Sequence, residues 1–160
     1  MTLYVLRHGI AEDAGLRQSD SDRRLTHEGE TKLRRVMKRA REGGVSPTHI
    51  ITSPYVRARA TAKIAAEELG FSEQLIETAF LEPHVGIQDL WQEIRVLAGS
   101  ETTMLVGHNP QLSAFVSVAI GCSSFGVEMK MAGLAALDVF GQGTQLRASL
   151  GWLLTSKTAG

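Results

Sequence analysis

The chain has 160 residues, of which 43% are hydrophobic and 21% are charged, values typical of a globular protein. Lys and Arg together number 17, and so do Asp and Glu, so the formal net charge is zero. This balance argues against a nucleic-acid binder or a membrane-surface binder, because both classes usually carry a basic excess.

The length predicts one domain over residues 1–160, long enough to bury a sizeable core. The single cysteine, Cys122, cannot form a disulfide within the chain, which suits a reducing compartment. The first residues lack the charged and apolar regions of a signal peptide, and no apolar run approaches the roughly 20 residues that span a bilayer. We therefore expect a cytoplasmic protein.

Charge is unevenly distributed along the chain. Residues 1–66 hold 13 basic and 7 acidic residues, whereas residues 67–160 hold 4 basic and 10 acidic ones. Solvated helix faces are the simplest interpretation of such an excess. A positive field around an anionic substrate is the alternative.

The first predicted elements are a strand, a loop and a helix. Residues 3–6 are continuously apolar, as in a parallel strand that is buried on both faces. Residues 7–25 are polar and irregular, which favours a loop over a site. An apolar stripe then predicts a helix over residues 27–42, which Gly43-Gly44 ends.

A second strand is predicted over residues 49–52. Ser53-Pro54 follows it as the cap and first residue of a helix that runs to residue 69. Residues 75–76 form a short third strand in this interpretation, residues 80–83 a loop, and the stripe over residues 87–97 another helix.

The last third of the chain adds three strands and one helix. Residues 102–106 predict a buried strand, after which Asn109-Pro110 begins a helix. Residues 134–140 and 146–154 predict two strands, joined by a hairpin at Gly141-Gln142-Gly143. The alternation predicts an α/β fold, a three-layer α/β/α sandwich whose central sheet is mostly parallel and has an antiparallel edge.

Three of the predicted strands are followed by polar or charged residues. The first leads into Arg7-His8-Gly9, the second into Ser53-Pro54 with Arg57 soon after, and a later one into Gly107-His108-Asn109-Pro110. Ligands of open α/β sheets bind at the carboxyl ends of the strands. We therefore expect two histidines and two arginines to meet at one edge of the sheet.

These residue types indicate phosphate chemistry. An arginine fork matches phosphoryl oxygens, so Arg7 and Arg57 can hold a tetrahedral dianion from two sides. A neutral imidazole can attack phosphorus and store the group covalently, which makes His8 the candidate nucleophile. Its other ring nitrogen should then donate to a backbone carbonyl. His108 can stay protonated and stabilise charge on the equatorial phosphoryl oxygens in the transition state.

Three motifs in this order resemble those of the histidine phosphatase superfamily, whose fold is called phosphoglycerate-mutase-like. The motifs are Arg7-His8-Gly9, the ten residues from Ser53-Pro54 through Arg57 to Ala62, and Val106-Gly107-His108-Asn109-Pro110. The short chain, and Leu25-Thr26 with Gly29, look like the SixA-type phosphohistidine phosphatase branch. The resemblance covers essentially the whole chain.

By position, the resemblance implies catalytic and phosphate-binding roles. His8 would be the phosphorylated nucleophile, Arg7 and Arg57 the phosphate binders, and His108 the second histidine of the site. Asn109, beside it, is a further candidate for binding the substrate phosphate.

Two more positions are left open by the resemblance. Arg23 resembles an arginine near the phosphate pocket of this branch, but Arg24 stands where the branch often has proline, so either arginine could reach the pocket. Larger members carry a glutamate as general acid, and Glu82 lies in about the right segment. The short branch often lacks this acid, because a departing imidazole needs less help.

The resemblance implies a metal-independent phosphatase without a cofactor. Its expected substrate is phosphohistidine on a partner signalling protein, such as a phosphotransfer domain, because a compact chain leaves the pocket open to a protein surface. Residues 10–13 depart from the mutase pattern and disfavour phosphoglycerate.

Several alternatives remain beside this interpretation. A small phosphorylated metabolite is the alternative substrate, and a non-catalytic module that binds phosphorylated partners is the rival from another class. A zinc site at His8 and His108 is disfavoured, because no third ligand is evident and the arginines would repel a cation. Neither nucleic acid nor a membrane is expected as a partner.

Overall fold

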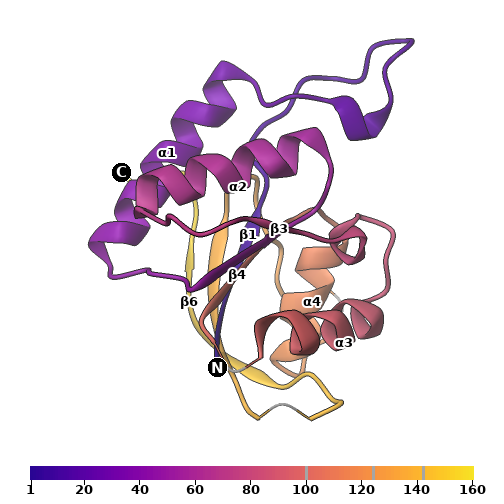
Figure 1. The fold of residues 1–160 in the computed structure, drawn as a ribbon, viewed down its shortest axis with the longest axis vertical. Coiled ribbons are helices and arrows are strands. Elements are labelled where there is room, and N and C mark those ends of the chain that lie inside the picture. Colours follow the sequence, from indigo (N-terminus) through magenta and orange to yellow (C-terminus); the bar gives the residue numbers. More distant parts are fainter. Residues whose placement is uncertain (100, 124, 142) are drawn as a thin grey trace.

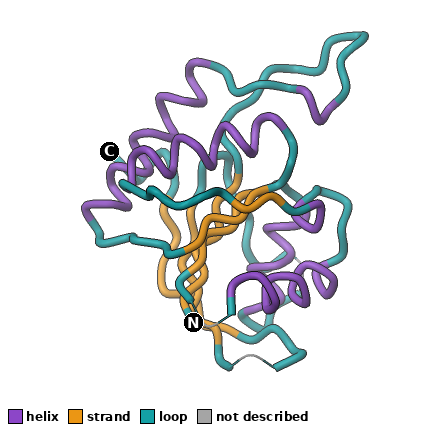
Figure 2. The backbone as a smooth tube through the Cα atoms, in the orientation of Figure 1, coloured by secondary structure: helices purple, strands orange, loops and turns teal. Residues whose placement is uncertain are grey.

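The computed structural model describes residues 1–99, 101–123, 125–141 and 143–160, and its centre is a six-stranded sheet (Figure 1, Figure 2). The strands lie in the order β3-β2-β4-β1-β5-β6. Their bounds are β1 Thr2–Arg7, β2 His49–Thr52, β3 Ile76–Glu77, β4 Thr103–Gly107, β5 Leu134–Val139 and β6 Ala148–Leu154. The four strands β1 to β4 pair in parallel, whereas β5 is antiparallel to both β1 and β6. The predicted, mostly parallel sheet with an antiparallel edge is confirmed.

Helices cover both faces of the sheet, which confirms the predicted three layers. The first layer holds α1 (His27–Glu42) and α2 (Val56–Leu69), and the second holds α3 (Ile87–Ala98) and α4 (Gln111–Ala119) (Figure 1). Neighbouring residues of β4 point to opposite layers: Met104 packs with α1 and α2, and Leu105 packs with α3 and α4. A continuously apolar strand is therefore required at this position, because both of its faces are buried.

The helix α1 begins and ends as its sequence predicts. Thr26 caps it, with its Oγ1 accepting a hydrogen bond from the Gly29 nitrogen at 2.9 Å, and Gly43 follows its last residue. Three of its six basic residues form ion pairs: Lys32 with Glu28 at 2.6 Å, Arg34 with Glu67 at 3.0 Å and with Glu68 at 2.8 Å, and Arg39 with Glu42 at 3.4 Å. These surface pairs favour the interpretation of the basic excess as a solvated helix face.

Two predicted helix starts are wrong by a small number of residues. The helix α2 begins at Val56 and not at Pro54, and Ser53 Oγ contacts both the ring of His108 at 2.7 Å and the Tyr55 nitrogen at 3.3 Å. The helix α4 begins at Gln111, after Pro110. Asn109 Oδ1 accepts a hydrogen bond from the Ser113 nitrogen, in the first turn of α4, at 3.3 Å. Both predicted cap residues thus keep a backbone contact near the start of their helix.

Other boundaries differ slightly from the prediction. The third strand is Ile76–Glu77, one residue later than expected, and the loop expected over residues 80–83 begins with a 3₁₀ turn, η2 (Ala79–Leu81). A second 3₁₀ turn, η1 (Asp20–Asp22), lies in the loop after β1. The strands β5 and β6 are shorter than predicted, and the expected hairpin includes Gln142, which lies outside the described residues.

Within the described parts of the chain, no helix has both the length and the apolar character needed to cross a membrane. The single cysteine, Cys122, is exposed.

Candidate active site

Three segments meet at the carboxyl edge of the parallel strands. His8 follows β1, Arg57 lies in the first turn of α2 after β2, and His108 follows β4, and these three strands are neighbours in the sheet. The rings of His8 and His108 have their centroids 5.1 Å apart. The residues His8, Arg57 and His108 are 5%, 3% and 1% exposed, respectively, so the site is buried. The structure thus brings together the residues that the sequence predicts to converge.

Hydrogen bonds determine which nitrogen of His8 carries the proton. Its Nδ1 lies 2.7 Å from the carbonyl oxygen of Gly9, and its Nε2 lies 3.2 Å from the Nε of Arg57. Arginine can only donate, so Nε2 is the acceptor and Nδ1 donates to Gly9. This is the backbone contact expected from the sequence, and it places a lone pair on Nε2.

The surroundings of His8 keep its ring neutral. Burial, as the largest effect, and the charges of Arg57, Arg7 and Arg23 together lower its pKa to about 4, against the opposing effect of the hydrogen bond to the Gly9 carbonyl. At neutral pH the imidazole is therefore uncharged and Nε2 carries no proton, which a nucleophile requires.

His108 lies between His8 and the start of α2. Its Nε2 is 2.7 Å from Ser53 Oγ, and its ring centroid is 4.8 Å from that of Tyr55. Burial, followed by the charges of His8 and Arg57, lowers its pKa to about 3. The protonated state that the sequence allowed for His108 is therefore disfavoured in the phosphate-free site, because burial disfavours a second cation next to Arg57.

Arg7 ends β1 and lies beside His8 in the chain, and its side chain reaches the segment before β5. Its Nη1 donates to the carbonyl oxygen of Met129 at 3.0 Å, and Asn109 donates to the same oxygen from Nδ2 at 2.9 Å. The Nε of Arg7 is buried without a hydrogen-bond partner among the described residues. Arg7 and Asn109, both predicted to bind phosphate, thus share a backbone anchor that sequence patterns do not reveal.

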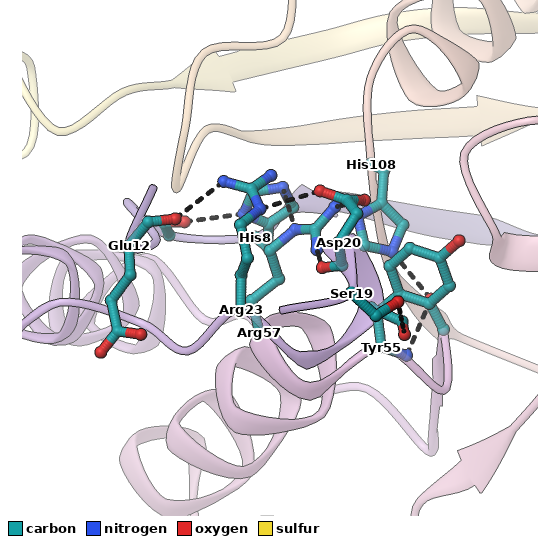
Figure 3. A network of polar contacts seen from close by, with 11 residues as sticks. His8, Glu12, Ser19, Asp20, Arg23, Tyr55, Arg57 and His108 are labelled. Atoms are coloured by element: carbon teal, nitrogen blue, oxygen red, sulfur yellow. Dashed lines mark hydrogen bonds and ion pairs between the residues drawn. The ribbon is translucent and has the colours of Figure 1, made fainter. Parts of the chain in front are cut away.

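The loop after β1 brings Asp20 and Arg23 to the site (Figure 3). Arg57 donates from Nη1 to the Asp20 carbonyl oxygen at 2.6 Å and from Nη2 to its Oδ2 at 3.0 Å. Arg23 donates from Nε to Asp20 Oδ1 at 2.8 Å. Of the two arginines that the sequence left open, Arg23 faces the site through Asp20, whereas Arg24 is exposed. Asp20 was not predicted; the only local signal is an acidic residue three positions before Arg23.

Glu82 lies near the third motif but is not joined to the two histidines by any contact among the described residues. It follows η2, whose Leu81 packs its carbonyl against Gly107. The Glu82 carboxylate is 3.8 Å from His84 Nε2, and its side chain is 24% exposed. Its role as a general acid therefore stays a prediction.

Metal ligation was the alternative use of these histidines. In the described ranges of the chain, no three His, Cys, Asp or Glu side chains gather in a way that could hold a metal ion.

Comparison with known proteins connects this geometry to a family. A model described as histidine phosphatase superfamily (branch 1) matches residues 3–89, which include Arg7, His8 and Arg57. An uncharacterized protein of Picosynechococcus sp. strain PCC 7002 is 37% identical over 139 residues, covering 86% of this chain and 84% of that protein.

A mutase and a phosphatase are also similar to this chain. A protein of Photorhabdus laumondii named probable phosphoglycerate mutase GpmB is 38% identical over 89 residues, which cover 54% of this chain and only 40% of the mutase. The structure of the protein histidine phosphatase SixA complexed with tungstate superimposes with a TM-score of 0.87 at 19% identity, covering 98% of each chain. This likeness confirms the phosphoglycerate-mutase-like fold.

Proposed function

This chain belongs to the histidine phosphatase superfamily, and we propose that it hydrolyses phosphohistidine on a partner protein through a phosphohistidine intermediate at His8. The observation that carries the proposal is the state of His8: a buried, neutral ring with its lone pair on Nε2, next to Arg57 and His108.

The proposed reaction has two steps at the same nitrogen. The Nε2 lone pair of His8 attacks phosphorus and forms a new N–P bond, while the N–P bond of the substrate breaks. The substrate ring, which carries a proton from solvent on its other nitrogen, takes the electron pair of the broken bond and leaves as neutral imidazole. Water then attacks phosphorus, the N–P bond to His8 breaks, and its electron pair returns to Nε2. Both protons of the water leave with inorganic phosphate, and the ring of His8 is neutral again. Splitting the transfer in this way replaces one difficult step by two easier ones.

The arginines would neutralise the charge that moves with the phosphoryl group. Arg57 has its guanidinium beside His8 Nε2, where the transferred phosphorus must pass. Arg7 and Arg23 add positive charge, as their effect on the pKa of His8 indicates. In a buried site such fixed charges act more strongly than in water, and phosphoryl transfer depends mainly on this and on positioning.

The choice of phosphohistidine as substrate rests on the fold and on the leaving group. The fold of SixA extends over nearly the whole chain, and that protein is named a protein histidine phosphatase. An imidazole leaves without a strong general acid, which suits a site where no described contact brings Glu82 to the histidines. A partner of the phosphotransfer type, in the cytoplasm, is the setting that we propose.

A small phosphate ester is the second candidate substrate. Glu82 favours it, because this carboxylate follows Leu81, which packs against Gly107 beside His108. An alkoxide is a poorer leaving group than imidazole, so an ester would need such an acid. Glu82→Gln should then slow ester hydrolysis strongly and phosphohistidine hydrolysis little.

A substrate panel tests the proposed function. Initial rates are measured on a phosphohistidine phosphotransfer protein, free phosphohistidine and sugar phosphates. We expect the highest kcat/KM on the protein substrate. A clear preference for a sugar phosphate would replace the substrate class, and no turnover of any of them would contradict the proposed activity.

Replacing the nucleophile tests the proposed mechanism. His8→Gln should lower kcat by roughly a thousandfold or more, because a side chain that forms the intermediate cannot be bypassed. In wild type, acid-labile and base-stable label from the substrate should be trapped on His8. His27→Gln, at an exposed histidine in the first turn of α1, is the matched control. Retained turnover in His8→Gln would refute the assignment of His8.

A further inference from the structure

The carboxylate of Asp20 is bound to the guanidinium of Arg57, which the proposed reaction needs for binding phosphate. Each of the three nitrogens of Arg57 is engaged: Nε with His8, and both Nη atoms with Asp20. The fork of Arg57 therefore faces the carboxylate and backbone carbonyl of Asp20 in the way that it would face two phosphoryl oxygens.

Asp20 is held from two sides by arginines. Its Oδ2 accepts from Arg57 at 3.0 Å and its Oδ1 accepts from Arg23 at 2.8 Å. Burial raises the pKa of Asp20, but the hydrogen bonds from Arg57 and Arg23 outweigh this, and the pKa lies below its ordinary value. The side chain is consequently a carboxylate at neutral pH. Two arginines around one anion form the arrangement expected for the substrate phosphate.

The carboxylate of Asp20 also lies where the phosphoryl group of the substrate is expected, beside the two histidines. Its charge raises the pKa of His108, against the larger effects that lower it, so the carboxylate lies close to the histidine pair. In Figure 3, Asp20 lies in front of His8 and His108, with Arg23 and Arg57 beside it. His8, Arg57 and His108 are buried, whereas the Asp20 side chain is 54% exposed, which places Asp20 at the mouth of the site.

Asp20 is carried by a surface turn that contributes no side chain to the hydrophobic core. It begins η1, in the long loop that follows β1 and passes the first turn of α2 (Figure 1). The loop is joined at its base by the bridge between Ala11 and Leu25 and by the hydrogen bond from the Glu12 nitrogen to the Arg24 carbonyl. None of the residues described in η1 is buried.

A physical reason for this contact exists in the ligand-free protein. Arg57 is 3% exposed, and a buried cation without a counterion is strongly destabilising. Asp20 is the carboxylate that pairs with it among the described residues. The same pairing has a cost when phosphate binds, because the anion must first displace Asp20.

We propose that Asp20 is an internal competitor for the phosphate subsite, which stabilises Arg57 in the resting protein and sets the KM of the reaction. The inference rests on the proposed function for its kinetic part only. Displacement of Asp20 costs the same free energy for the bound substrate and for the transition state. Such a uniform cost raises KM and leaves kcat unchanged. Arg23 keeps the displaced carboxylate at the rim.

Anion binding tests the proposal without turnover. Tungstate is titrated into wild type, Asp20→Asn and Asp20→Ala by calorimetry. Removing one charge-assisted competitor should tighten tungstate binding about tenfold in both variants. Asp22→Asn is the matched control, since Asp22 lies in the same turn and its carboxylate has no partner among the described contacts. Unchanged or weaker binding in the two Asp20 variants would overturn the proposal.

Thermal unfolding and kinetics separate this role from others. Without anion, Asp20→Ala should melt below wild type, and tungstate should raise its Tm more than it raises that of wild type. On a phosphohistidine substrate, KM should fall and kcat should stay. A fall in kcat at constant KM would show that Asp20 takes part in the chemical step, and it would overturn the proposed role as a competitor. Tighter tungstate binding without any turnover would uphold Asp20 as competitor and contradict the phosphatase activity, so the two failures are distinguishable.

Discussion

The chemistry of His8 depends on which of its two ring nitrogens carries a proton. The Gly9 carbonyl receives the proton of Nδ1, and Arg57 donates to Nε2, so both positions are determined by neighbours. Burial then keeps the ring from gaining a second proton. A histidine in water would exist partly as the cation near pH 6.5, and the cation has no lone pair with which to attack phosphorus.

The same burial predicts how the stability of the protein depends on pH. The pKa values of His8 and His108 are about 4 and about 3 in the folded protein, below the ordinary value of 6.5. Between pH 4 and pH 6.5 these histidines bind more protons in the unfolded chain than in the folded protein. The free energy of unfolding should therefore be highest above pH 6.5 and should fall steadily as the pH drops toward 4. Urea unfolding at pH 7.0, 6.0 and 5.0 measures this.

His8→Gln provides the comparison for that measurement. It removes one of the two buried titrating groups, so the loss of stability between pH 7.0 and pH 5.0 should be smaller than in wild type. His27→Gln should retain the wild-type loss. If His8→Gln loses as much stability as wild type over this interval, the lowered pKa of His8 is not what links folding to pH.

At the scale of elements, the start of α1 is joined to the backbone just after His8. Thr26 donates to the carbonyl oxygen of Ile10 from its backbone nitrogen at 2.9 Å. Gly29, in the first turn, packs so closely that a Cβ there would overlap the same carbonyl. The Leu25-Thr26 segment with Gly29, seen in the sequence as a family resemblance, therefore has a structural use: it holds the segment that follows the nucleophile.

This contact predicts the effect of a methyl group at Gly29. Alanine normally favours a helix over glycine by about 0.5–1 kcal/mol. Here Gly29→Ala should instead destabilise the protein by about 1–3 kcal/mol, because the backbone of Ile10 must shift. Urea unfolding of Gly29→Ala and of Gly15→Ala measures the difference, since a Cβ at Gly15 meets only Gln18 at 3.9 Å. A neutral or stabilising Gly29→Ala would show that α1 is not held closely to this backbone.

At the scale of the whole molecule, β4 is the strand on which the two layers meet. It lies between β2 and β1, and all five of its residues are buried. The side chains of β4 alternate between the two hydrophobic clusters, and His108 follows its last residue. A substitution in β4 therefore affects the packing of one layer and the strand that carries His108. Its carboxyl end also positions His108.

A cavity in this strand should therefore have a large effect on stability. Leu105→Ala removes a fully buried side chain and should lower the free energy of unfolding by about 2–5 kcal/mol. The control is Val96→Ala on α3, where the valine is 80% exposed and a change within about 0.5 kcal/mol is expected. Chemical denaturation measures both. A similar, small effect of the two variants would contradict a tightly packed centre of the sheet.

Charge at this scale is distributed between the two halves of the chain. Arg34, from the basic first part, pairs with Glu67 and Glu68, which begin the acidic second part. The excess of basic residues is thus partly compensated at the surface between α1 and α2. The positive charge that remains relevant to chemistry is local: Arg7, Arg23 and Arg57 around His8.

The sequence alone determined the order and type of the elements and the convergence of His8, Arg57 and His108. Apolar runs and amphipathic stripes are local properties, and they are sufficient to locate strands such as β1 and β4 and helices such as α1. Parallel strands end at one edge of a sheet, so the meeting of their terminal residues follows from order alone.

Only the tertiary structure decided the state of the site. The contact of Asp20 with Arg57 joins residues 37 positions apart, and that of Ser53 with His108 joins residues 55 positions apart. The neutral ring of His108 results from burial by several elements, which no local pattern encodes. Such contacts depend on how loops and helix ends pack over the strand ends, because the partner of a polar side chain is chosen by distance in space and not by distance along the chain.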